Sequence, residues 1–157
     1  MNTLHVVGAV LLFSLTAFNT QRHQMDLHRQ QMRAEVEMQA TIAGTRLLDQ
    51  LALLPFDANV GTDDVALFTP DSAFGGAQTL AEAVVLHDVH GMRAVLSGSS
   101  GSAPMAFQAD VSVAYVQPSS GGFVAASAPT RFMEVSLDIQ GELNSSLSLK
   151  RVYSASR

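Results

Sequence analysis

The chain has 157 residues, of which 47% are apolar, enough for one ordinary domain with a real core and an extension. It contains no cysteine, which excludes disulfides and thiolate metal sites. Its formal net charge is −5, and residues 1–54 balance four arginines against four acidic residues, so the deficit falls on residues 55–157. A nucleic-acid-binding surface needs a basic stripe, so no nucleic-acid partner is expected.

The first 54 residues contain no proline, and Pro55 ends them. They predict one long α-helix of roughly 80 Å, at about 1.5 Å per residue. From Leu4 to Phe18 nearly every residue is apolar, whereas after Asn19 apolar residues recur at steps of three, four and seven, which keeps one helix face apolar. That face carries Met25, Met32, Val36, Ala40, Ala43, Leu47, Leu51 and Leu54. A helix with two such different halves indicates assembly rather than catalysis.

The apolar run at residues 4–18 has three other interpretations. A signal peptide is disfavoured because no Lys or Arg precedes the run and no convincing small-x-small cleavage site follows it. An ordinary membrane span needs about 20 residues, more than this run offers, although the polar residues flanking it fit near the interfaces. A buried core helix is disfavoured because the run continues into a long amphipathic extension.

Residues 55–157 predict a globular head. Residues 55–104 form its connecting loop, since aspartate, asparagine, glycine and proline crowd residues 57–76. Within the loop we expect a short helical turn near residues 80–85, a tight turn at residues 87–91 and a short strand at residues 92–96. The serine- and glycine-rich residues 97–104 predict a flexible exposed loop.

The last third, residues 105–157, predicts an antiparallel sheet. Apolar and polar residues alternate over residues 107–115, 133–139 and 147–153, so each strand has one buried face. Residues 118–122 and the Gly141 region are the expected connections. Residues 25–54 of the helix are expected to cover the sheet, giving an α+β fold in two layers. The helix residues assigned to this packing are Val36, Ala40, Ala43, Leu47, Leu51 and Leu54.

No pattern of catalytic residues is recognisable, so the chain is not expected to be an enzyme. Four serines at residues 97–102 lack the glycine-x-serine-x-glycine elbow of a nucleophile. No cofactor is expected, and calcium in the head is the only ligand with candidate residues. Calcium needs six to eight converging oxygens, whereas aspartates near glycines are more typical of solvated turns. The candidates for a metal are Asp57, Asp63, Asp64, Asp71, His87, Asp88 and His90.

Four segments in order resemble the type IV pilin superfamily, more closely its minor pilins and pseudopilins. The first is the helix that is apolar and then amphipathic. The second is LLDQLALLPFD at residues 47–57, similar to the family's LLPFD helix ending. The third is LHDVHGM at residues 86–92, similar to the acidic DDxDDxxG segment. The fourth joins RFMEVSL at 131–137 with SLSLKRV at 146–152, similar to the closing hairpin.

The resemblance covers nearly the whole chain and implies a structural subunit of an extracellular, pilus-like filament made of many copies. It implies an inner-membrane location and an inner-membrane assembly platform before assembly, with residues 1–24 as the membrane and filament-core segment. The implied core residues are Leu4, His5, Val6, Val7, Val10, Leu11, Leu12, Phe13, Leu15 and Phe18. The alternative is a membrane-anchored pseudopilin or binding module of a secretion or uptake system.

The chain departs from the family pattern at its start. No basic leader precedes Gly8, so we expect Met1 to be the mature N-terminus. His5 then stands where the family has a glutamate that pairs with a neighbour's amine, and a neutral histidine can only accept a hydrogen bond there. Because Ser14, Thr16, Asn19 and Thr20 compete for backbone hydrogen bonds, any kink of the helix within a filament is expected between residues 14 and 22.

Overall fold

The computed structural model describes residues 2–59, 61, 64–100, 103–141 and 146–155. The chain forms two compact units, Met1–Glu35 and Val36–Arg157. The boundary between them lies at residue 35. We call Val36–Arg157 the head and describe each unit by itself.

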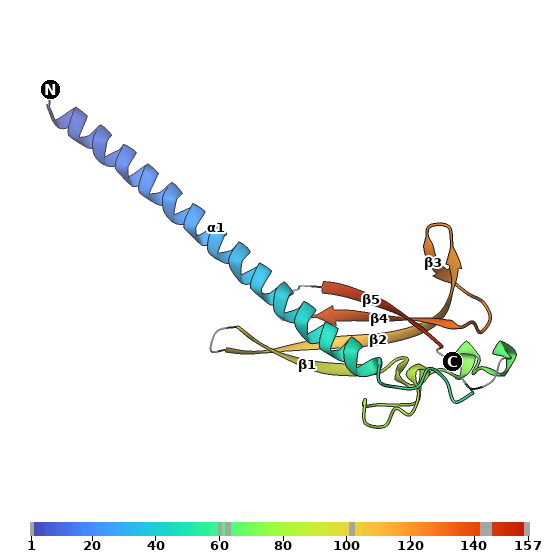
Figure 1. Ribbon diagram of the computed structural model, residues 1–157. Helices are drawn as coiled ribbons and strands as arrows, with labels where there is room; N and C mark the ends of the chain where they lie inside the picture. The colour runs from blue at the N-terminus through green and yellow to red at the C-terminus, as the bar shows by residue number, and fades with distance from the viewer. Residues whose placement is uncertain (1, 60, 62–63, 101–102, 142–145, 156–157) are drawn as a thin grey trace. The chain divides into compact units, whose positions relative to one another are not determined.

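One helix, α1, runs from Asn2 to Leu51 and belongs to both units (Figure 1). It is unbroken through residues 14–22, so the single chain has no kink in the region where we expected one within a filament. The helix was expected to reach Leu54, but α1 ends at Leu51, and residues 52–54 form a tighter turn. Leu53 N donates to Gln50 O and Leu54 N to Leu51 O, and Pro55 follows without a backbone donor to continue the helix.

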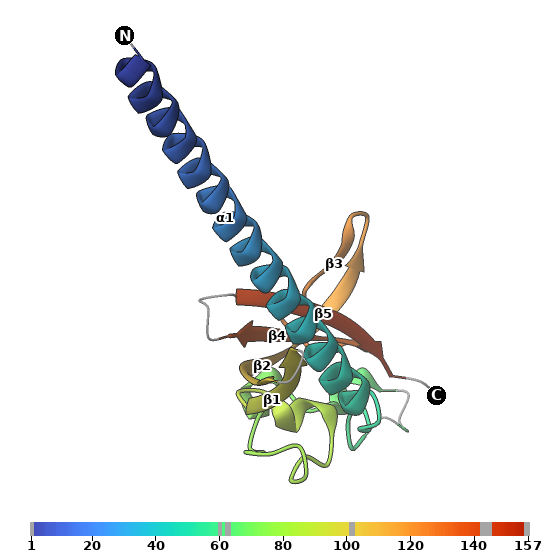
Figure 2. The ribbon, with the colours of Figure 1, turned by 90° about the vertical axis from the view of Figure 1, so that its left-hand side faces the viewer.

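The head contains a five-stranded antiparallel sheet, so the α+β class is confirmed. Its strands are β1 (Arg93–Ser100), β2 (Ala103–Ser119), β3 (Gly122–Ala125), β4 (Phe132–Gln140) and β5 (Ser146–Ser154). The spatial order is β1-β2-β4-β5, and β3 pairs with the last residues of β2. Figures 1 and 2 both show β3 and the end of β2 turning away from the other strands.

Two predicted loops are strand over most of their described residues. The segment 97–104 was expected to be a flexible loop, but Ser97–Ser100 complete β1 and Ala103 begins β2, with Ser99 opposite Pro104. β1 begins at Arg93, where a short strand was expected at residues 92–96, and it continues to Ser100. Residues 118–122 were also expected to be a loop. Ser120 and Gly121 do form a turn, but Pro118 and Ser119 belong to β2 and pair with β3, which begins at Gly122. Serine and glycine have low strand propensity, but pairing with a neighbouring strand overrides propensity.

The inner face of the sheet packs against the head's part of α1. Alternate residues of β2 and β4 are fully buried there, which agrees with the alternation in the sequence. The helix approaches the sheet closely at Gly44, where an added Cβ would lie 2.5 Å from Ile139 Cδ1 and 2.6 Å from Leu149 Cδ1. Gly44 therefore permits the close approach of the two layers. The buried inner-face residues are Phe107, Ala109, Val111, Val113, Tyr115, Met133, Val135, Leu137 and Ile139.

The described part of the segment from Pro55 to Met92 contains three short 3₁₀ helices: η1 (Val65–Leu67), η2 (Asp71–Ala73) and η3 (Leu86–Val89). The helical turn expected at residues 80–85 is a hydrogen-bonded turn there, and η3 follows at 86–89, where a tight turn was expected. Gly91 then takes a φ of +77°, which suits glycine. The rings of Phe56, Phe68, Phe74 and Tyr115 pack together and anchor this segment to β2.

Candidate functional site

The first unit presents a continuous apolar surface, which we call the apolar helix surface. Its described side chains are all more than half exposed, from 55% at Phe18 to 75% at Phe13. They lie all round the helix rather than on one face, because the run has hardly any polar residue to interrupt it. The members are Val7, Val10, Leu11, Leu12, Phe13, Leu15 and Phe18. The side chains of Leu4, His5 and Val6 lie outside what the structure describes.

The hydroxyl groups within this stretch are satisfied by the helix itself. Ser14 Oγ donates to Val10 O at 2.8 Å, and Thr20 Oγ1 donates to Thr16 O at 2.8 Å. Thr16 Oγ1 lies 3.0 Å from Leu12 O and 2.9 Å from Phe13 O. A buried hydroxyl without a partner would be costly, whereas these three already have one. The stretch is thus suited to burial among apolar groups.

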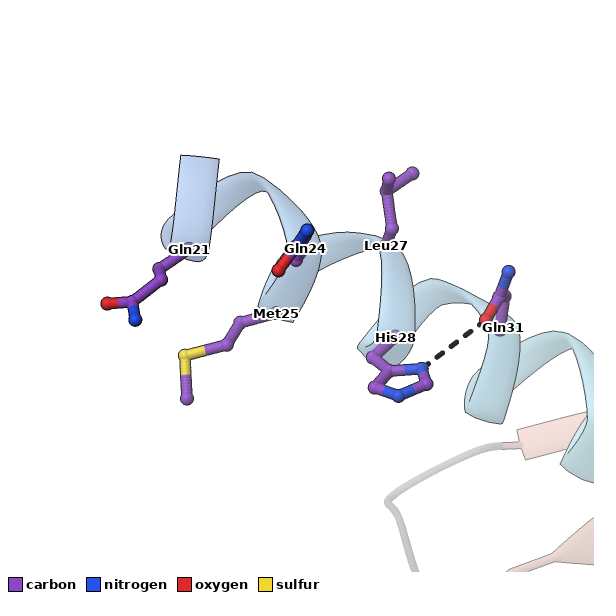
Figure 3. Close-up of a pocket in the computed structure, with 6 residues that line it drawn as sticks. All are labelled: Gln21, Gln24, Met25, Leu27, His28 and Gln31. Atoms are coloured by element: carbon purple, nitrogen blue, oxygen red, sulfur yellow. Dashed lines mark hydrogen bonds between the residues drawn. The ribbon is translucent and has the colours of Figure 1, made fainter. Parts of the chain in front are cut away.

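The helix surface that follows mixes polar and apolar side chains. Gln21, Gln24, Met25, Leu27, His28 and Gln31 line an open groove along the helix, and all six belong to α1 (Figure 3). His28 Nδ1 lies 3.4 Å from Gln31 Oε1 and both side chains are exposed, as expected for a solvated histidine. A groove formed by one helix encloses nothing, so it does not make a catalytic pocket.

The helix residues assigned to sheet packing all lie in the core of the head. Val36, Ala40, Ala43, Leu47 and Leu51 are buried, and Leu54 is partly buried against the same cluster. Leu48 is also buried, although the apolar steps from Met25 to Leu54 do not include it in the predicted face. Tyr153 Oη donates to Leu48 O at 2.7 Å, and Arg151 Nη1 lies 2.6 Å from Asp49 Oδ1. The last turn of α1 is therefore tied to β5.

A buried polar cluster joins the two ends of the connecting segment. Asp57 is 1% exposed, and its carboxylate accepts from Asn59 N at 2.8 Å and from Thr69 N at 2.9 Å. His87 Nε2 lies 3.5 Å from Asp57 Oδ2, and His87 Nδ1 lies 3.4 Å from Asp88 Oδ1. The imidazole ring stacks on Phe74 with centroids 5.2 Å apart. These contacts hold the segment in shape.

The candidate metal residues do not converge. Among the described residues, no group of three or more histidine or acidic side chains is placed to hold an ion. Asp64 caps η1 by accepting from Ala66 N, and His90 Nδ1 lies 3.0 Å from both N and O of Val113. Asp63 lies outside the described residues. The contacts of Asp57, Asp64, His87, Asp88 and His90 thus hold the local fold or cap a turn, and they do not converge on one point.

Two tyrosines of the head are held in their protonated form. Burial raises the pKa of Tyr115 above its ordinary value, and the charges of Asp57 and Asp71 raise it further. Its hydroxyl donates to Thr69 O at 3.0 Å. Burial also raises the pKa of Tyr153, although the nearby Arg151 opposes the shift. Both hydroxyls therefore serve as hydrogen-bond donors to main-chain carbonyls.

The sequence matches no known protein-family model, and no curated protein or solved structure is similar enough to count as a match. Within the described residues, no helix combines the length and the apolar character needed to cross a membrane.

Proposed function

We propose that the chain is a structural subunit of an extracellular, pilus-like filament and polymerises through its apolar helix surface. The observation that carries the proposal is the exposure of seven large apolar side chains along one stretch of helix. Fully burying such side chains is worth about 1.5–3 kcal/mol each, so together they favour burial by on the order of 10 kcal/mol or more. A surface of this kind needs a cover, and copies of the same helix offer one.

The internal hydrogen bonds of Ser14, Thr16 and Thr20 support the proposal, because packing against other helices would leave none of these three hydroxyl donors without a partner. The head supports it in a different way. Its own core is complete from Val36 onward, so the stretch before it is not required to fill the core. Before assembly, the apolar segment would rest in the inner membrane, where an assembly platform would collect the subunits.

The test is to place a charge on the apolar helix surface. Leu11→Arg or Phe13→Asp should abolish filaments, because a charge buried without a partner is strongly unfavourable. Leu67→Arg is the matched control, since Leu67 is an apolar residue of the head that is 55% exposed. Filament yield is measured by shearing and sedimentation, and circular dichroism checks that the head remains folded.

Two outcomes would contradict the proposal. Normal filament yield from either helix variant would show that the apolar helix surface is not the contact. A wild-type chain that remains in membranes and never sediments as sheared fibres would favour the alternative, a membrane-anchored pseudopilin or binding module.

A further inference from the structure

A two-stranded ribbon projects from the head. It consists of Val116–Ser119 of β2 paired with Gly122–Ala125 of β3, and we call it the β3 ribbon. Figures 1 and 2 both show it leaving the plane of the other strands. Every residue from Gln117 to Ala125 is exposed. An isolated two-stranded ribbon is only marginally stable in water, so a further contact would stabilise it.

The two faces of the β3 ribbon differ in what they contact. Successive side chains of a strand point to opposite faces, so Phe123 and Val124 lie on opposite faces. Phe123 is opposite Pro118, and its ring packs on Phe132 at the start of β4 with centroids 5.3 Å apart. Val124 is opposite Gln117 and is 45% exposed, and Phe123 on the other face is 44% exposed. The faces therefore differ in one respect: the Phe123 ring packs on the ribbon's own head, whereas no ring contact among the described residues lies on the Val124 face.

The β3 ribbon is uncharged on an acidic head. Residues 36–157 contain twelve Asp or Glu and only six Lys or Arg, a net charge of −6. The longest stretch of the head without a charged residue is 111–130, which includes the whole ribbon. Like-charged molecules repel one another when they are packed closely. Copies of this head can meet through the ribbon without bringing carboxylates together.

We propose that the Val124 face of the β3 ribbon packs against the head of a neighbouring copy of the same chain. The inference rests on the proposed filament, because only a polymer places many acidic heads side by side. In a helical filament each subunit meets its neighbour through two different surfaces, one on each copy. The ribbon supplies one of these surfaces, and a different part of the neighbouring head supplies the other.

A photo-cross-linking experiment tests the contact directly. Val124 is replaced by an amino acid with a benzophenone side chain, and wild-type-like filaments are irradiated and then dissolved. The expected products are a ladder of covalent dimers, trimers and longer chains, because each copy gives one link and receives another. The same probe in place of Val95, which is 74% exposed on β1, is the matched control and should give no ladder. Links only to other proteins, or no links in intact filaments, would overturn the inference.

A charge variant tests the same contact without a probe. Val124→Asp should lower the yield of sheared filaments at least about tenfold, because it buries a carboxylate against another acidic head. Val95→Asp adds the same charge elsewhere and should leave the yield unchanged. Wild-type yield from Val124→Asp would overturn the inference while leaving the proposed filament intact. Absence of filaments from the wild-type chain would instead contradict the proposed function itself.

Discussion

Asp57 is expected to be among the most important polar residues for the stability of the head. Its carboxylate holds two main-chain donors, Asn59 N and Thr69 N, and lies 3.5 Å from the His87 imidazole. A buried donor that loses its partner costs about 1–3 kcal/mol, and both donors here are only partly buried. Asp57→Ala should therefore lower the free energy of unfolding by about 2–4 kcal/mol. Asp57→Asn keeps one carbonyl oxygen and should lose about half as much.

Urea unfolding of the full chain in a mild detergent, followed by circular dichroism, measures the effect. Asp110→Ala is the matched control. It removes a carboxylate that forms an exposed ion pair with Arg93, with Arg93 Nε 2.8 Å from Asp110 Oδ1. Exposed pairs contribute about 0–1 kcal/mol. If Asp57→Ala unfolds within about 0.5 kcal/mol of the wild type, the cluster does not hold the connecting segment in the way described.

Two further predictions concern the head as a whole. Deleting residues 1–28 should give a soluble α+β monomer that unfolds cooperatively, because the core begins at Val36. Sedimentation and urea unfolding measure this, and aggregation or a broad unfolding transition would contradict it. The second prediction concerns pH. Folding raises the pKa of Tyr115 and of Tyr153, so above about pH 10 the unfolded chain releases tyrosine protons that the folded chain retains. The free energy of unfolding should therefore fall as the pH rises above about 10. The fall should approach about 1.4 kcal/mol per pH unit for buried Tyr115 and less for partly buried Tyr153, and a urea midpoint unchanged between about pH 9 and 11 would contradict it.

The long helix and the strands on the inner face were predictable because their periodicities are strong. Apolar steps of three and four place Val36, Ala40 and Leu47 on one face, and strict alternation in residues 133–139 matches the burial of β4. These patterns follow from the backbone geometry of helix and strand alone. The α+β class therefore follows from local sequence.

Other features depend on contacts that no local pattern records. Ser97–Ser100 form a strand because β2 pairs with them, although serine and glycine favour turns. Asp57 and His87 are thirty residues apart in the sequence and meet only once the connecting segment is folded. The β3 ribbon has a sequence signal, the uncharged stretch 111–130, but the pairing of Phe123 with Pro118 had to come from the structure.

Electron microscopy of sheared material from cells that express the chain tests the central proposal most directly. The proposal predicts helical filaments whose central density consists of bundled helices from residues 2–35, with the acidic heads outside. It also predicts that the filaments disappear in Leu11→Arg and persist in Leu67→Arg. Filaments whose centre is built from the heads, or an absence of filaments with the protein confined to membranes, would contradict it.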